Sequence, residues 1–323
     1  MEIGYKLSSE EQRPNDLVKY ARLAEDAGFG FAMISDHFHP WIDKQGQSPF
    51  VWSVIGALAH TTTRLQIVTG VTCPIIRIHP AILAQAAATS AAMLPGRFVF
   101  GVGAGENLNE HVVGARWPNN AVRLEMLVEA IEIMRDLWKG ELSSHRGKYY
   151  EVDNAKIYTR PDTPPPIVIA AGGEKAAELA GRIGDGLVMT SAQPEQIKIF
   201  ERAGGKGKPK YGELGVCWAQ DEKQARRTAK EWWPTSTLAS SLHWELPLPE
   251  HFEEASEDAT EEEVAQEIVC GADPAKHVEK IREYAKAGFD HVCIHQVGPE
   301  QEGFIAFYER EVLPKLTRER AAA

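Results

Sequence analysis

The stretch Phe31-Ala32-Met33-Ile34-Ser35-Asp36-His37-Phe38-His39-Pro40-Trp41 contains the most informative residues of the chain. Its first four residues are apolar, which is typical of a strand buried in a parallel sheet. A carboxylate, two imidazoles and an indole follow where that strand ends. In an α/β barrel, active sites are built at the carboxyl ends of the strands. The stretch therefore indicates either a proton-transfer site or an ordinary helix start with a buried His and Trp.

Segments with strand and helix patterns alternate along the whole chain, which predicts an α/β fold of the (β/α)8 TIM-barrel class with insertions. The predicted strands span residues 3–7, 31–36, 65–71, 98–103, 167–170, 186–190, 213–218 and 291–296. The predicted helices span residues 14–28, 49–62, 81–94, 122–139, 174–183, 194–203, 222–232, 274–288 and 301–316. An eightfold alternation favours a closed parallel barrel over an open doubly wound sheet.

Three segments interrupt this alternation, at about 104–121, 141–166 and 234–262. The second is predicted to form a β-hairpin, whose strands 148–152 and 155–158 flank a turn at Asp153-Asn154. An acidic run at 250–267 is predicted to form a solvated helical face. No insertion is large enough for a domain of its own, so residues 1–323 are predicted to form a single TIM-barrel domain.

The composition is that of a soluble globular protein, with 43% hydrophobic residues, 25% charged residues and a net charge of −11. This acidic balance argues against nucleic acid and against an anionic membrane surface as partners. No apolar run approaches the roughly 20 residues that span a bilayer, and the N-terminus lacks the features of a signal peptide. The four cysteines are far apart, so we expect neither disulfides nor a zinc site, and a cytoplasmic location.

Candidate site residues follow the first six predicted strands. Glu10 follows the first strand, although an acidic residue also favours the start of a helix. Residues 101–110 follow the fourth strand; their glycines would let a ligand approach the backbone, and Glu106 would place a carboxylate at the barrel mouth. The other candidates are residues 69–74, Ala171-Gly172-Gly173 and Thr190-Ser191. A glycine turn at a helix N-terminus can bind a phosphate, but a tight turn is the commoner reason for it.

The pair His37 and His39 allows a different hypothesis. On an extended segment, two imidazoles at this spacing can lie on one side and bind a metal, as in barrel metallohydrolases. Such a site needs further ligands, and residues 167–171 and 187–190 contain no His, Asp or Glu. His295 is the only other candidate, so a metal-dependent hydrolase is the less favoured alternative and no metal is predicted.

Four segments together resemble a known family. They are Gly4-Tyr5-Lys6, Ser35 to Trp41, Gly101-Val102-Gly103-Ala104-Gly105-Glu106-Asn107-Leu108-Asn109-Glu110 and Ala170-Ala171-Gly172-Gly173. From Gly4 to its last predicted helix, the chain resembles the bacterial luciferase-like superfamily, and within it the coenzyme F420-dependent glucose-6-phosphate dehydrogenases. The resemblance implies a TIM-barrel oxidoreductase, commonly a homodimer, that transfers a hydride between a small-molecule substrate and carbon C5 of the deazaflavin F420. An FMN-dependent monooxygenase of the same superfamily is the alternative, and a deazaflavin carrier without turnover is another.

The resemblance also implies roles for individual residues. His37 is the base that takes the proton of the substrate hydroxyl, Trp41 covers the reacting face, and Glu106 donates a proton near the deazaflavin. Glu10 corresponds to a further active-site acid, and Asp36 to a cofactor contact. The other implied cofactor contacts are Gly70 and Val71, in a bulge that often contains a non-proline cis peptide, and Cys73, Ala104, Gly105, Asn109, Ala171, Gly172, Gly173, Thr190 and Ser191.

The chain departs from these relatives where they hold the sugar phosphate with basic residues. One basic residue follows the Thr-Ser pair, where this chain has Ala192-Gln193. Others lie in the segment that here contains Glu253-Glu254 and Glu267. Because like charges repel, an acidic segment is a poor setting for a phosphate dianion. We therefore expect a neutral alcohol, a carbonyl or an activated alkene as the substrate rather than glucose 6-phosphate.

Overall fold

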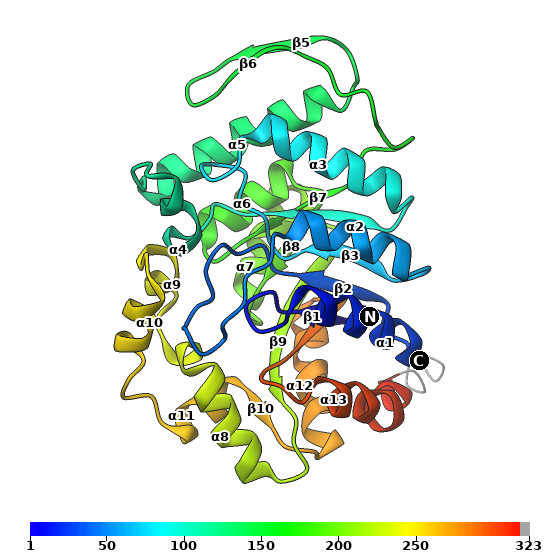
Figure 1. Ribbon diagram of the computed structural model, residues 1–323, viewed down its shortest axis with the longest axis vertical. Helices are drawn as coiled ribbons and strands as arrows, with labels where there is room; N and C mark the ends of the chain where they lie inside the picture. Colours follow the sequence, from blue (N-terminus) through cyan, green and yellow to red (C-terminus); the bar gives the residue numbers. More distant parts are fainter. Residues whose placement is uncertain (317–323) are drawn as a thin grey trace.

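The computed structural model describes residues 1–316, and a closed barrel of eight parallel strands lies at its centre (Figure 1). The barrel strands are β1 (Glu2–Leu7), β2 (Phe31–Ile34), β3 (Gln66–Thr69), β4 (Phe98–Val102), β7 (Ile167–Ala170), β8 (Gly186–Met189), β9 (Lys210–Cys217) and β11 (His291–Gln296). Each strand pairs with the next, and β11 pairs with both β9 and β1, which closes the barrel. The predicted fold class is confirmed.

Helices surround the barrel and follow the strands along the chain (Figure 1). They are α1 (Pro14–Ala27), α2 (Val51–Thr61), α3 (Pro80–Met93), α5 (Asn120–Leu137), α6 (Glu174–Ile183), α7 (Pro194–Phe200), α8 (Glu222–Trp232), α12 (Pro274–Ala287) and α13 (Gln301–Phe307). Local signals explain α1, which has Pro14 at its start and ends at Gly28 in the left-handed region, with φ 96°. None of the helices in residues 1–316 is long and apolar enough to cross a membrane.

The insertion at about 141–166 contains a β-hairpin, but the predicted position of its turn is wrong. The strands are β5 (Ser143–Arg146) and β6 (Glu151–Ala155), so Asp153-Asn154 lies within a strand and the turn spans 147–150. The reason is a contact distant in sequence. Glu129 on α5 accepts hydrogen bonds from the backbone N–H groups of residues 148, 149 and 150, at 2.9 to 3.2 Å. Three donors on one carboxylate hold the turn at this place.

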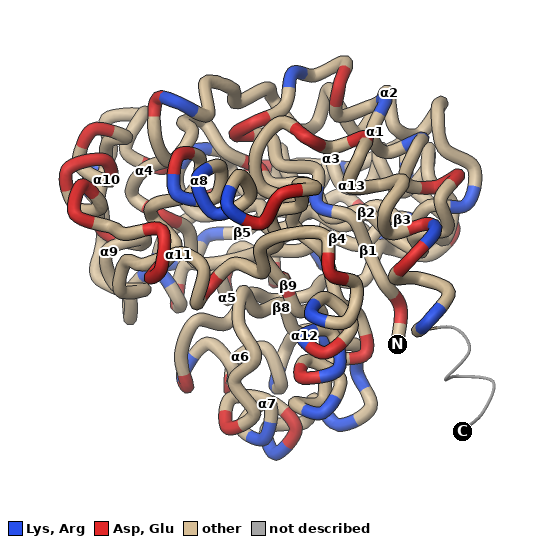
Figure 2. Tube along the Cα trace, turned by 90° about the horizontal axis from the view of Figure 1, so that it is seen from below, with Lys and Arg blue, Asp and Glu red and all other residues tan. Residues whose placement is uncertain are grey.

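The other insertions form short helices. The first contains α4 (Asn107–Glu110), and the third contains a 3₁₀ turn (Pro234–Thr237), α9 (Ser240–Glu245) and α10 (Pro249–Ala255). Helix α11 (Glu261–Glu267) begins at its end, and the short strand β10 (Val269–Cys270) follows beside β9. The acidic run forms α10 and α11, most of whose Asp and Glu residues are exposed, as predicted. Figure 2 marks these acidic residues in red along the two helices. Phe252 is fully buried, so α10 packs on the molecule through an apolar face.

Candidate active site

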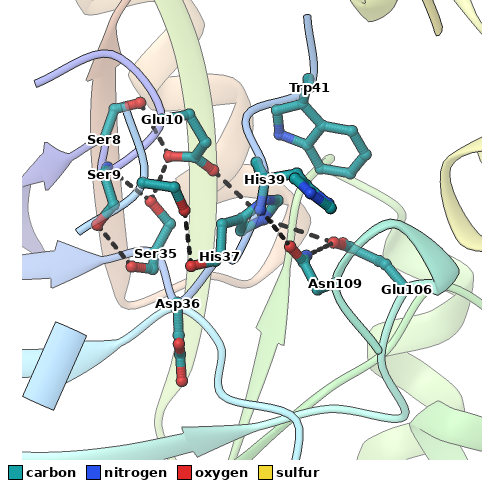
Figure 3. A network of polar contacts seen from close by, with 12 residues as sticks. Ser8, Ser9, Glu10, Ser35, Asp36, His37, His39, Trp41, Glu106 and Asn109 are labelled. Atoms are coloured by element: carbon teal, nitrogen blue, oxygen red, sulfur yellow. Dashed lines mark hydrogen bonds and ion pairs between the residues drawn. The ribbon is translucent and has the colours of Figure 1, made fainter. Parts of the chain in front are cut away.

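A histidine between two carboxylates forms the centre of the candidate active site (Figure 3). His37 follows β2, Glu10 follows β1 and Glu106 follows β4, so three neighbouring strand ends supply them. The Nε2 atom of His37 lies 3.3 Å from Glu10 Oε1 and 3.4 Å from Glu106 Oε2. The ring of Trp41 lies beside it, with 5.0 Å between the ring centroids. The structure therefore brings together all four residues that the resemblance implies to be catalytic.

Hydrogen bonds from serine side chains hold Glu10 in place. Its Oε2 accepts from the hydroxyl of Ser35 at 2.5 Å and from that of Ser8 at 3.1 Å. Burial alone would raise the pKa of Glu10, but His37, Lys6 and the Ser35 hydrogen bond together lower it below its ordinary value. Glu10 is therefore an ionised carboxylate that stabilises positive charge on the His37 ring. Sequence reasoning missed both serines, whose only signal is their position at the ends of β1 and β2.

Glu106 has the opposite environment from Glu10. Burial and the nearby Glu10 raise the pKa of Glu106, and these effects outweigh His37, which lowers it. Asn109, one turn further along α4, donates from Nδ2 to Glu106 Oε2 at 3.0 Å. The Oδ1 atom of Asn109 accepts from the backbone N–H of Phe38 at 2.8 Å. Asn109, implied to contact the cofactor, thus links the loop of His37 to Glu106.

The backbone selects the tautomer of His37. Its Nδ1 lies 3.1 Å from the carbonyl oxygen of His39, and a carbonyl only accepts hydrogen bonds. The proton of a neutral His37 ring therefore belongs on Nδ1, which leaves the Nε2 lone pair free to accept a proton. Since Nε2 faces Glu106, which retains a proton more readily than an ordinary carboxyl, the two groups can share one proton. This arrangement suits general acid–base catalysis.

The segment after β3 contains the non-proline cis peptide that the resemblance implies. The peptide bond between Gly70 and Val71 is cis. Lys6, on β1, donates from Nζ to the carbonyl oxygen of Gly70 at 3.3 Å. A Cβ atom added to Gly103, at the end of β4, would lie only 2.9 Å from Cγ2 of Val71. The glycine at 103 is therefore needed for the close packing of this bulge against β4.

Asp36 belongs to a second cluster of polar side chains. Figure 3 shows the Asp36 side chain pointing away from Glu10 and Glu106. Its carboxylate accepts from the hydroxyl of Thr72 at 2.7 Å and from the guanidinium of Arg77 at 2.8 Å. Arg77 also lies 3.6 Å from Glu110, on α4. All three charged side chains are almost completely buried. The cluster thus connects the loops after β2 and β3 to α4, the helix that follows Glu106.

Gly105 and Cys73 pack in the same region as this cluster. Gly105 has φ 79°, in the left-handed region, and a Cβ atom there would lie 2.3 Å from Sγ of Cys73. Cys73 is buried, and burial raises the pKa of its thiol well above the ordinary value. Both residues therefore shape the backbone beside the site rather than offer a reactive group.

Glu110 is expected to make the stability of the protein depend on pH. Burial raises its pKa from 4.5 to about 7. Because the folded-state pKa is above the unfolded one, the stabilisation is complete below about pH 4.5 and is lost as pH rises through about 7. The loss is on the order of 3 kcal/mol, from about 1.4 kcal/mol per pKa unit.

The test compares wild type with Glu110→Gln by chemical denaturation between pH 5 and pH 8. We expect the free energy of unfolding to fall more steeply with pH in the wild type, because glutamine cannot ionise. Equal slopes for the two proteins would contradict the assignment, whatever the offset between their stabilities.

The glycine turn after β7 leads directly into α6. No side chain in the described part of the chain caps this helix, and Gly173 occupies its N-cap position. The N–H groups of the first turn therefore lack helical partners and suit an anion. Apart from the residues next to it in the chain, no heavy atom of residues 1–316 lies within 4 Å of a Cβ position at Gly173, whereas one at Gly172 would lie 2.5 Å from the ring of Trp244. Ser191, at the end of β8, receives a hydrogen bond from Gln193 at 2.8 Å. These donors fit a phosphate group.

Gly173→Asp is expected to weaken binding of a phosphate-bearing cofactor at least about tenfold, because the carboxylate would repel the phosphate. Aspartate is a good N-cap residue, so the thermal stability should stay equal or rise. Gly173→Ala is the matched control, since the space at this position is open. The measurement is a fluorescence titration with cofactor, and wild-type affinity in the aspartate variant would count against a phosphate site here.

A network of buried charges lies below the site, inside the barrel. Lys6 and Glu213 form an ion pair at 2.7 Å, and His295 lies 3.3 Å from Glu213 and 3.2 Å from Glu11. Burial lowers the pKa of His295, but the two carboxylates raise it to about 9, so the ring is charged at neutral pH. His295, the candidate third metal ligand, thus serves as a cation here. Within residues 1–316, no group of three or more His, Cys, Asp or Glu side chains is arranged to hold a metal ion.

The third insertion contributes rings to the site rather than charges. Glu253, Glu254 and Glu267 are exposed, and Glu253 accepts from the backbone N–H of Asp43 at 2.9 Å. The ring of His243 lies 5.2 Å from that of Trp41. The three carboxylates on which the expectation of poor phosphate binding rests therefore lie at the surface. Sequence reasoning missed His243, because a helix this short has no usable periodicity.

Comparisons with known proteins agree with this geometry. The sequence profile of the family described as luciferase-like monooxygenase matches residues 1–291. The chain is 36% identical to the F420-dependent glucose-6-phosphate dehydrogenase of Segniliparus rotundus, over 98% of each protein. It is 37% identical to the F420-dependent glucose-6-phosphate dehydrogenase of Microbacterium testaceum, also over 98% of each protein.

Solved structures give the same picture. An F420-dependent secondary alcohol dehydrogenase in complex with an F420-acetone adduct is 30% identical, with a TM-score of 0.90 over 97% of this chain and 98% of that one. The coenzyme F420-dependent tetrahydromethanopterin reductase of Methanopyrus kandleri shares the fold, with a TM-score of 0.78 at 21% identity over 97% of this chain and 99% of that one. From these matches over nearly its whole length, the chain belongs to the luciferase-like family and is related within it to the F420-dependent dehydrogenases.

Proposed function

We propose that the protein is a coenzyme F420-dependent oxidoreductase that interconverts a neutral alcohol and its carbonyl compound. The placement of His37 between two carboxyls, one with a lowered and one with a raised pKa, beside an indole, carries this proposal. Such a set moves a proton to or from a substrate hydroxyl. The relative of known structure that is named a secondary alcohol dehydrogenase, with a TM-score of 0.90, supports this substrate class.

In the proposed reaction, Nε2 of His37 takes the hydroxyl proton of the alcohol. Ionised Glu10 stabilises the imidazolium that forms, as a carboxylate does in other acid–base sites. Trp41 excludes water from the reacting face. Glu106, whose pKa is raised by burial and by Glu10, is the proton donor on the cofactor side. When bound, the deazaflavin supplies a carbon that accepts or gives a hydride.

The residues that would hold the cofactor come from several strand ends. The bulge at Gly70-Val71, with the neighbouring Cys73, Ala104 and Gly105, would support the ring, and the main chain at Asp36 would border it. The turn Ala171-Gly172-Gly173, with Thr190 and Ser191, would bind the phosphate. The unpaired amides and the open space at Gly173 support this assignment.

A cofactor titration tests the proposal against the FMN-dependent monooxygenase alternative. We expect F420 to bind and its absorbance in the visible range to decrease when an alcohol is added. FMN is expected to bind weakly. A panel of secondary alcohols, ketones and sugar phosphates then identifies the substrate. Tight FMN binding without F420 binding would overturn the proposal, and F420 binding with no turnover on any substrate would favour a carrier.

We further propose a cytoplasmic homodimer. The four cysteines are free and buried, which suits a reducing compartment. Large apolar side chains are exposed on neighbouring elements of one side of the barrel, at Phe50 (55% exposed) before α2 and at Ile82 (58%) and Met93 (38%) on α3. Apolar side chains that are exposed together usually mark a surface that a partner molecule covers. Light scattering with size-exclusion chromatography measures the mass directly.

A further inference from the structure

Lys6 and Glu213 carry opposite charges into the interior of the barrel. Lys6 is next to Met33 in the register of β1 and β2, and Glu213 is next to Cys293 in that of β9 and β11. Register partners on neighbouring strands point to the same face of a sheet. Met33 and Cys293 belong to the apolar cluster inside the barrel, which has members from nearly every barrel strand. Both charged side chains therefore point inward, where they form an ion pair at 2.7 Å.

An ion pair is an unusual filling for a barrel. The interiors of such barrels are dominated by branched apolar side chains, and the neighbouring positions Val68, Val99 and Val168 follow that rule. Removing two charges from water commonly costs more free energy than their attraction returns. Apolar side chains would thus fill the same space at least as well, so the pair calls for a role beyond packing.

The ammonium group of Lys6 reaches two parts of the active site. Its Nζ donates to the carbonyl oxygen of Gly70 at 3.3 Å, in the bulge after β3. Burial raises the pKa of Glu10, but His37 and then Lys6 lower it. Burial also raises the pKa of Glu106, and Lys6 is among the groups that oppose this rise. Since a charge has such effects only at short range, the ammonium lies close to both carboxyls as well as to the bulge.

Neighbours on several elements keep Lys6 charged and in one place. Burial would lower its pKa, but Glu213 on β9 and Glu10 after β1 raise it above the ordinary value. Cys293 on β11 also faces Lys6, and burial raises the pKa of this thiol so far that it is neutral. His295 holds the other oxygen of Glu213, at 3.3 Å. Lys6 is therefore a fixed cation over the whole pH range in which the protein is active.

We propose that Lys6 is a positioning residue for the reaction, and that Glu213 holds it in place. Its ammonium fixes the carbonyl of Gly70 in the bulge that would support the cofactor ring. The same charge keeps Glu10 ionised, so that Glu10 can stabilise the imidazolium of His37. The inference rests on the proposed function, because it assigns Lys6 to the support of that reaction.

The first test needs no cofactor. Protein with ¹³C at the δ-carbon of glutamate is titrated by NMR, and the Glu10 signal is identified by its loss in Glu10→Gln. Lys6→Met keeps the length of the side chain and removes its charge. We expect the midpoint of the Glu10 titration to rise by about one pH unit in this variant. Lys6→Arg, which keeps the charge, should restore a midpoint close to that of the wild type.

Lys210→Met is the matched control. Lys210 is also a buried lysine on a barrel strand, but it begins β9, where its Nζ lies 3.5 Å from Glu201 and 3.7 Å from Asp290. This variant should leave the Glu10 titration unchanged. Lys6→Met removes the cation that faces Glu213 and can fail to fold for that reason. Lys6→Met/Glu213→Gln avoids this charge, and the same rise is expected in it.

A fluorescence titration with F420 tests the contact at the bulge. Lys6→Met should bind F420 about tenfold more weakly, the effect of one hydrogen bond from a charged donor, whereas Lys210→Met should bind it like the wild type. The acidic limb of the kcat/KM profile should move to higher pH in Lys6→Met by the same amount as the Glu10 titration, because this profile reports groups of the free enzyme. A merely structural role for Lys6 would not move it.

The outcomes separate the two proposals. An unchanged Glu10 titration in Lys6→Met would overturn the electrostatic role of Lys6, and unchanged F420 affinity would overturn its role at the bulge. Equal changes in Lys210→Met would show a general loss of packing and overturn both roles. If the wild type binds no F420, the proposed function fails, while the NMR titration still decides whether Lys6 controls Glu10.

Discussion

His37→Ala is expected to lower kcat by a factor of about 10² to 10⁴ while F420 binds as before. The reason is that Nε2 of His37 is the unprotonated nitrogen of the neutral ring and faces both Glu10 and Glu106. Apart from the main chain at Asp36, the segments proposed to bind the cofactor follow β3, β4, β7 and β8. The measurement pairs single-turnover F420 reduction by the best alcohol with an F420 titration.

His39→Ala provides the control for this variant. His39 is two residues away and carries the same ring, but its Nδ1 lies 3.0 Å from the carbonyl oxygen of Leu108, outside the carboxylate pair. A much smaller loss of kcat is expected. If His37→Ala retained wild-type turnover, or if both variants lost it equally, His37 would not be the base.

Glucose 6-phosphate is expected to be a poor substrate, with kcat/KM at least about 10³ lower than that of a neutral secondary alcohol. Binding a phosphate dianion needs charge-assisted donors worth roughly 1.5–3 kcal/mol each, so the loss of two or three costs several orders of magnitude. Ala192-Gln193 follows Ser191 where the resemblance implies a basic residue, and His243 beside Trp41 is neutral. The check is F420 reduction with both substrates under the same conditions.

Charge-restoring variants sharpen this comparison. Gln193→Lys should raise kcat/KM for glucose 6-phosphate about tenfold, while Gln196→Lys, one turn along α7, should not. Efficient oxidation of glucose 6-phosphate by the wild type, with a micromolar KM, would show that other cations serve the phosphate. Lys198 and Arg202, which follow Gln193 in the chain, are candidates for this role, and Lys198 already pairs with Glu195 at 2.6 Å.

The barrel could be predicted because its signals are local. The apolar run of β2 and the Pro14 and Gly28 ends of α1 are each complete within a few residues. The hairpin of the second insertion was placed wrongly for the opposite reason. Its turn depends on Glu129, about 20 residues away, and the local Asp-Asn signal at 153–154 carries less weight than three hydrogen bonds to that carboxylate.

The residues of the candidate site could be predicted from the sequence, but the hydrogen bonds and ion pairs among them could not. The segments that contain His37, Glu106 and the glycine turn follow strands that any parallel barrel brings to one end. Nothing local indicates that Asn109 links Glu106 to the His37 loop, or that Asp36 turns away toward Arg77. Lys6 and Glu213 carried a usable signal, because charged residues inside otherwise apolar strands must find partners in the barrel.

The sequence by itself therefore determined the barrel, the family and the residue types available for proton transfer, since these follow from periodicity and from motifs within single segments. Only the tertiary structure decided which of the two carboxyls holds a proton more readily. Glu10 and Glu106 are chemically alike, but hydroxyl donors and Lys6 favour the charged form of one, while burial near a like charge favours the neutral form of the other. Such differences arise from neighbours on other strands, and only folding creates those neighbours.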